Sequence, residues 1–319
     1  MRASQFSDAE TLRETVREAL QETLYERSHM SGSGPAELAD EVSEAAATGE
    51  VKAIFADIRK AMQMPLVNLI WRRLAVSTAA LSWTWDTMKP LYSGGAIYEE
   101  AARLRDGQIL PPVPRLPPSA LRAVGVDGPA EMSIRAILAG YDRGNPLNLI
   151  AFSTVLERLR DEKEAGMQQG DDAETRPVET QNDTSRAALP PAPRILSFAD
   201  MDETTATLAR AASLIGAPEA GPHVWVSLPR HLAYWPGFLS LYFTALKPLH
   251  DDGRLFSAVD AVLADGRNRG RRLVSKLGDN GLPPETVRTS VRKPIETLVP
   301  HAMGRMIPVV SLLQRMLSE

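Results

Sequence analysis

Three kinds of polar side chain in this sequence could serve chemistry on a carboxylate. The side-chain amide of Asn145 can accept a hydrogen bond from water while it donates one to a carboxylate. Arg72 and Arg230 could each bind a carboxylate through the planar guanidinium group. His223 and His231 could act as bases, because the pKa of an imidazole lies near neutrality.

Each of these residues also has an interpretation without chemistry. Asn145 precedes Pro146, and an Asn-Pro pair is a good start for a helix, so the amide could instead cap the helix that follows. Arg72 and Arg230 could lie on a solvated helix face, and His223 could be an ordinary, partly buried histidine. The residue types alone leave both interpretations open.

Composition limits the chemistry further. The sequence contains no cysteine, which excludes disulfides, thiol redox chemistry, a cysteine nucleophile and cysteine-ligated zinc. It shows neither a cluster of metal ligands nor a glycine-rich phosphate loop, so we expect no metal and no cofactor. The net charge of −4 argues against a nucleic-acid partner. The apolar runs are too short to span a membrane, and the N-terminal segment is polar and acidic. We therefore expect a cytoplasmic protein with no membrane partner.

Helices must position the candidate residues. Apolar side chains recur with the helical period in 53–64, 66–88, 133–138 and 147–159, whereas alternating strand patterns are scarce. Pro65 and Pro90 are predicted to mark helix ends. The tryptophans at 71, 83 and 85 are expected to pack inside the helical core. The sequence therefore predicts an all-α fold.

Two stretches of the chain, 72–95 and 230–253, match at a constant offset of 158 residues. Nine of the 24 aligned positions are identical, among them Arg72 with Arg230 and Gly95 with Gly253. A duplication of this kind predicts two tandem helical repeats that form a pseudo-dimer. Because ligand sites often lie at such interfaces, we expect the functional cleft between the repeats.

Two breaks in composition divide the chain. A Ser- and Gly-rich stretch at 31–35 ends an amphipathic pattern, so residues 1–40 are predicted to form a loosely docked N-terminal helical arm. A polar stretch that ends in several prolines predicts a disordered linker over 161–195. The two helical repeats then occupy residues 41–160 and 196–319.

Three short motifs, in this order along the chain, resemble those of the group I (D,L-) 2-haloacid dehalogenases. They are the segment from Ile58 to Pro65 followed by Leu74-Ala75, then Gly144-Asn145-Pro146, and then Leu232-Ala233-Tyr234-Trp235-Pro236. The resemblance covers residues 51–317 apart from the linker. It implies an all-α fold of two related units, similar to a dimer of the alkylhydroperoxidase-D-like (AhpD-like) helical unit. It also implies cofactor-free hydrolysis of a carbon–halogen bond in a short 2-halocarboxylate, in which activated water displaces halide with inversion.

The resemblance also assigns site residues one by one. Asn145 matches the family's water-orienting asparagine, and Ser227 matches the serine next to its catalytic aspartate. For Leu66, Leu69, Leu228 and Trp225, packing in the core is the alternative to binding substrate. The expected substrate-binding residues are Leu66, Leu69, Tyr141, Trp225 and Leu228.

The family's catalytic aspartate has no counterpart in this chain. Leu228 takes its place, and no acidic residue occurs from 221 to 248. His223, His231 or the nearby Glu219 could supply a base instead. Two interpretations follow: a 2-haloacid dehalogenase-like hydrolase, or a divergent relative that binds a small carboxylate without dehalogenating it. Because leucine cannot accept a proton, we expect weak halide release or none.

The expected partner is a small carboxylic acid, as substrate or as ligand. The sequence leaves open whether the chain also forms a homodimer.

Overall fold

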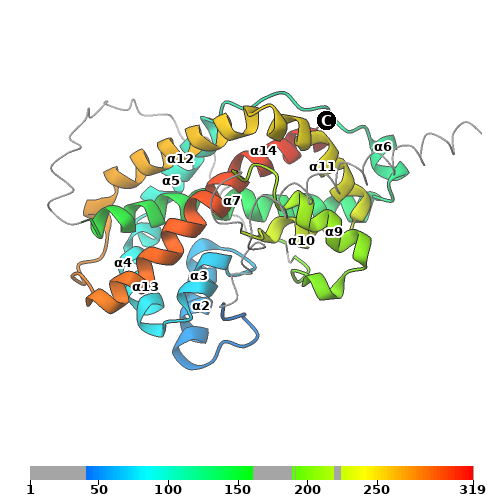
Figure 1. Ribbon diagram of the computed structural model, residues 1–319. Coiled ribbons are helices and arrows are strands. Elements are labelled where there is room, and N and C mark those ends of the chain that lie inside the picture. The colour runs from blue at the N-terminus through cyan, green and yellow to red at the C-terminus, as the bar shows by residue number, and fades with distance from the viewer. Residues whose placement is uncertain (1–40, 161–188, 191, 219–223, 319) are drawn as a thin grey trace, which may run out of the picture.

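The computed structural model describes residues 41–160, 189–190, 192–218 and 224–318, and every element in these ranges is helical (Figure 1). The all-α prediction is confirmed for this part of the chain. The helices of the first half are α2 (Gly49–Met62), α3 (Leu69–Leu74), α4 (Thr78–Ser93), α5 (Ala96–Asp106), α6 (Pro118–Ala123) and α7 (Gly128–Arg158). Those of the second half are η2 (Phe198–Asp200), α9 (Glu203–Ala212), α10 (Ser227–Leu232), α11 (Pro236–Asp251), α12 (Arg254–Arg272), η3 (Val274–Lys276), α13 (Glu285–Leu298), η4 (Val299–Gly304) and α14 (Arg305–Leu317).

The two halves share the spacing of their elements. α3, α4 and α5 begin 158 residues before α10, α11 and α12, which is the offset already visible in the sequence. Gly95 and Gly253 stand directly before α5 and α12, and the φ angle of both is 81°. Side chains disfavour this left-handed conformation, so the same turn requires glycine in both halves.

The apolar side chains gather in two clusters, and α7 contributes to both. Phe152, in the second half of α7, packs with α2–α5, whereas Ile134 and Ile137, in the first half, pack with α9–α11 and α14. α13 belongs to the second half of the chain, but its Val291 and Ile295 pack in the cluster around α2–α5. Figure 1 shows α7 across the centre, with α2 and α3 on one side and α9 and α10 on the other. Each half therefore contributes a helix to the apolar cluster of the other half, and the buried apolar surface stabilises their association.

Two prolines lie inside helices. Pro90 was predicted to mark a helix end, but α4 continues past it to Ser93. Pro146 lies inside α7, which runs through 31 residues, and every residue of α7 from Arg143 to Val155 is buried. Burial on this scale outweighs the backbone hydrogen bond that a proline removes. Because no helix starts at Pro146, the interpretation of Asn145 as a helix cap is wrong.

The predicted arm (1–40), most of the predicted linker (161–188 and 191), and the candidates Glu219 and His223 lie outside the described residues. Among the helices that the structure does describe, none combines the length and the apolar character that crossing a bilayer requires. Within the same residues, no three His, Asp or Glu side chains come together as a metal site.

Candidate functional site

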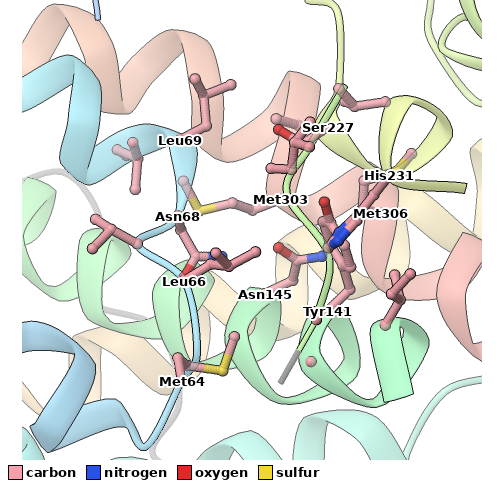
Figure 2. Close-up of a pocket in the computed structure, with 18 of the residues that line it drawn as sticks. Met64, Leu66, Asn68, Leu69, Tyr141, Asn145, Ser227, His231, Met303 and Met306 are labelled. Atoms are coloured by element: carbon pink, nitrogen blue, oxygen red, sulfur yellow. The ribbon is translucent and has the colours of Figure 1, made fainter. Parts of the chain in front are cut away.

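A partly open cavity lies between the helices of the two halves (Figure 2). Its volume is about 80 Å³, enough for several waters or one short organic ligand. Its walls come from the chain between α2 and α3 and from α3, α7, α10, η4 and α14. Six polar side chains reach it. They are Asn68, Arg72, Tyr141, Asn145, Ser227 and His231.

Apolar side chains form the rest of the wall, including Leu66, Leu69 and three methionines. Met64 comes from the first half and Met303 and Met306 from the second, and Figure 2 shows all three around the polar group. Methionine adapts its shape to a ligand. η4 is a π-helical turn, a feature frequent at functional sites. An apolar wall also strengthens the electrostatic interactions made inside it.

The chain between α2 and α3 lies close against α7. Gln63 follows α2 in a left-handed conformation, with φ of 51°, and its carbonyl accepts a hydrogen bond from Arg143 Nη1 at 3.2 Å. A Cβ on Gly144 would lie 3.0 Å from Met64 Cε and 3.2 Å from Asn68 Nδ2. The glycine of the Gly-Asn-Pro motif therefore permits the close approach that brings both segments to one cavity.

Two asparagines offer unpaired amide atoms at the cavity. Asn145 is 5% exposed, and its Nδ2 has no hydrogen-bond partner among the described residues. The Oδ1 atom of Asn68 also has none in that part of the chain. Leaving a buried polar atom unpaired costs about 1–3 kcal/mol. A donor and an acceptor are therefore available to a ligand or to water.

Arg72 brings a permanent positive charge to the cavity wall. Its side chain is 10% exposed, and its Nη2 lies 3.3 Å from Glu41 Oε2. The interpretation of Arg72 as a residue of a solvated helix face is therefore wrong. Arg230 stands at the matching position of α10 but does not line the cavity, and its guanidinium lies 5.7 Å from the centre of the Phe198 ring.

Tyr141 and Ser227 approach each other from α7 and α10. Burial raises the pKa of Tyr141 above its usual value, and the charges of Arg72 and Arg230 and a hydrogen bond with Ser227 offset only part of that increase. The phenol is therefore neutral near physiological pH and can donate a hydrogen bond to an anion.

His231 is almost fully buried, and its ring meets that of Tyr141 edge-on at 5.9 Å. The Nε2 atom lies 2.7 Å from the carbonyl oxygen of Pro193. Since a carbonyl only accepts hydrogen bonds, Nε2 carries the proton, and Nδ1 of the neutral ring is bare. Burial lowers the pKa of His231, while the Pro193 carbonyl acts in the opposite direction to a smaller extent. Nδ1 is buried and has no hydrogen-bond partner among the described residues.

No carboxylate lines the cavity within the described ranges. Asp142 is next to Tyr141 in the sequence, but its Oδ2 lies 3.3 Å from Arg105 Nη1, and burial raises its pKa. The described wall is therefore neutral or positive.

Five of the seven residues expected at the site line this cavity. They are Leu66, Leu69, Tyr141, Asn145 and Ser227. Their roles in binding or catalysis stay predictions.

Trp225, expected to face the cavity, and Leu228, expected near it as a substrate-binding residue, do not line it. Trp225 packs its ring against Phe198 at 5.7 Å, and Leu228 is fully buried in the cluster around α9–α11. The reason is the start of α10 at Ser227, because residues four apart share a helix face. Ser227 and His231 therefore share the cavity side, and Leu228 points into the core.

Two parts of the wall were missed in the sequence. Asn68 stands four residues before Arg72, a spacing that places both on one side of α3, and this spacing was an available signal. Ala192 and Ile195 also line the cavity, so the prediction of a disordered linker is wrong at its C-terminal end. Both side chains are partly buried, and no local pattern marks them as part of a cavity wall.

Comparison with known proteins identifies solved structures with a similar fold. No protein-family model matches the chain, and no curated protein matches it either. Among solved structures, a D-2-haloacid dehalogenase mutant superposes with a TM-score of 0.63 at 18% identity, over 89% of this chain and 98% of that one. A mutant complex with D-2-CPA gives a TM-score of 0.62 at 19% identity, over 87% and 95% of the two chains. A complex with L-LA gives 0.61 at 18%, over 89% and 98%. The chain therefore has the all-α fold of the D-2-haloacid dehalogenases.

Proposed function

We propose that the protein is a hydrolase related to the group I 2-haloacid dehalogenases, and that the cavity binds a short 2-halocarboxylate. The observation that carries the proposal is the meeting of Arg72, Asn145 and Ser227 in one small, mostly apolar cavity. The fold and the Gly-Asn-Pro motif support the same reaction class. Two of the similar structures are complexes with D-2-CPA and L-LA.

A carboxylate in this cavity would meet several donors. Arg72 supplies charge, Tyr141 a neutral hydroxyl and Asn145 an unpaired amide hydrogen. Hydrogen bonds to a charged group contribute about 1.5–3 kcal/mol each, and the dry wall around them reduces competition from water. The carbon–halogen bond and a short alkyl group would lie against the leucines and methionines. The volume of about 80 Å³ favours a short chain over a long one.

Hydrolysis needs a water directed at the second carbon of the substrate. The Asn145 amide can hold a water by hydrogen bonding, and the cavity confines it beside the reacting bond. A base must then remove a proton from that water, and Leu228 cannot do so.

The finer architecture belongs to the same proposal. Two tandem repeats that form a pseudo-dimer of AhpD-like units would explain the equal offset of three helices and the matched turns at Gly95 and Gly253. They would also explain the reciprocal exchange of α7 and α13 between the two apolar clusters.

The absence of a carboxylate from the described wall favours a second function. In that case, the protein binds a small carboxylate and does not break a carbon–halogen bond. The two functions share the binding step and differ only in the release of halide.

Halide release and binding, measured on the same protein preparation, separate these functions. We expect calorimetry to detect 2-chloropropionate binding and a halide electrode to detect chloride release from at least one enantiomer. Chiral analysis should find 2-hydroxypropionate of inverted configuration. Binding without chloride release would support the second function, and the absence of both would contradict the two functions together.

A further inference from the structure

We infer that His231 is the general base of this site and that its Nδ1 atom takes the proton from the attacking water. The inference rests on the proposed function and names the group that replaces the aspartate missing at Leu228. It comes from the geometry of α10, the chain at Pro193 and the cavity.

The ring of His231 is held in the orientation that a base requires. Its Nε2–H donates to the Pro193 carbonyl at 2.7 Å, which fixes the tautomer and restrains the ring. The bare Nδ1 atom is buried without a partner in the described part of the chain, and the side chain lines the cavity. Figure 2 shows the ring extending from α10 toward Tyr141 and Asn145. A histidine that acts as a catalytic base is commonly held by a hydrogen bond through one ring nitrogen, while the other ring nitrogen accepts the proton.

The start of α10 explains why position 231 reaches the cavity and position 228 does not. Ser227 and His231 stand four residues apart on the cavity side of the helix, whereas Leu228 faces the core. A carboxylate at 228 would lie in that core, while a base at 231 reaches the cavity from the same helix.

Burial keeps the ring neutral. The other ionisable groups that line the cavity in the described residues are Arg72 from α3 and Tyr141 from α7. Burial lowers the pKa of His231, and the hydrogen bond to the Pro193 carbonyl opposes this to a smaller extent. The charge of Arg72 is itself paired, because Glu41 Oε2 lies 3.3 Å from its Nη2. The neutral ring is the form that accepts a proton, so the base is ready at neutral pH.

The reaction balances without another reactant. The oxygen of water forms a bond to the second carbon as the carbon–halogen bond breaks, and the electron pair leaves with the halide. A proton of the water passes to Nδ1, and the imidazolium later releases it to solvent. The products are a 2-hydroxycarboxylate of inverted configuration, a halide ion and one proton.

His231→Gln tests this role, because the glutamine amide can still donate to the Pro193 carbonyl but cannot act as a base. We expect kcat for chloride release to fall by about 10²–10⁴-fold, with the Kd for 2-chloropropionate unchanged. In the wild-type protein, kcat/KM reports the free protein and should rise with pH through an inflection below the ordinary histidine pKa of 6.5 and then level off. The variant should lack that inflection.

Tyr234→Phe is the matched control. It removes the hydrogen bond from Tyr234 Oη to the Arg194 carbonyl, at 3.1 Å, and leaves His231 intact. This bond lies one residue from the His231 anchor on the same segment, so a loss of activity caused only by loosening that segment would appear in both variants. We expect the wild-type kcat and pH profile from Tyr234→Phe.

Three outcomes would overturn the role of His231. They are a His231→Gln variant with the wild-type kcat and inflection, wild-type binding of 2-chloropropionate without chloride release, and equal losses in His231→Gln and Tyr234→Phe. Absence of both binding and release would instead contradict the proposed function itself. If His231→Gln does not fold, long-range ¹H–¹⁵N spectra of the wild-type protein decide. A bare Nδ1 that shifts when 2-chloropropionate binds supports the role, and a protonated Nδ1 at neutral pH overturns it.

Discussion

α3 and α10 are both six residues long and stand 158 residues apart, yet they bring different chemistry to the cavity. α3 presents Arg72, with Asn68 directly before the helix, whereas α10 presents Ser227 and His231. At the constant offset, Ser227 corresponds to Leu69 and His231 to Arg73. Similar backbones can thus build an asymmetric cavity, with charge on one wall and a hydroxyl and an imidazole on the other. Such a site suits a ligand with a carboxylate at one end and a reacting carbon beside it.

The same two helices both carry a buried apolar residue at the position where the family resemblance places the catalytic aspartate. Leu228 corresponds to Ile70 at this offset, and both are buried in the apolar core at 0% and 1% exposure. Both side chains therefore pack in apolar clusters, but Ile70 also contributes to the cavity wall and Leu228 does not.

Leu228→Asp and Ile70→Asp test this comparison and should have the largest effects. Leu228→Asp places an unpaired carboxylate in the apolar core, so we expect a loss of about 3–5 kcal/mol in the free energy of unfolding by urea denaturation. Ile70→Asp should lose less, because Ile70 also borders the cavity. Leu228→Ile is the control and should cost less than about 1.5 kcal/mol. A stable Leu228→Asp protein that gains halide release would show that position 228 reaches the cavity, and the comparison would then fail.

Arg72→Met and Arg230→Met sharpen the difference between the helices. Arg72 lines the cavity and Arg230 does not, so only the first substitution should weaken carboxylate binding. A hydrogen bond to a charged group contributes about 1.5–3 kcal/mol, which corresponds to a Kd for 2-chloropropionate raised by about 10- to 100-fold. Calorimetry should find the wild-type Kd in Arg230→Met. Equal losses in the two variants would mean that both arginines act on the ligand.

Buried tyrosines give the smallest expected difference between the two halves. Tyr242 Oη donates to the Ala212 carbonyl at 3.1 Å, whereas Tyr92 Oη is buried with no hydrogen-bond partner in the described residues. We expect Tyr242→Phe to lower the free energy of unfolding by about 1 kcal/mol and Tyr92→Phe to leave it unchanged or raise it. Urea denaturation of the two variants side by side measures this. A larger loss in Tyr92→Phe would contradict the assignment of its hydroxyl as unpaired.

The local pattern of residues was sufficient for the fold class and for much of the site. An apolar stripe with the helical period depends only on neighbouring residues, so an all-α chain could be predicted from the sequence alone. The offset of 158 residues likewise anticipated the matching bounds of α3 with α10 and of α4 with α11. Short motifs were enough to bring Asn145 and Ser227 into one list of site residues.

Only the tertiary structure decided where helices break and which way their side chains point. The predicted helix over 66–88 is divided into α3 and α4, with Ser77 capping the second. In contrast, α7 continues through Pro146, because both of its halves pack in apolar clusters. Packing against distant elements also turned Leu228 into the core and His231 to the cavity, and it brought the Pro193 carbonyl to the histidine. Such contacts join residues far apart in the chain. Their free energy comes from surface buried between elements, and no window of local sequence contains that information.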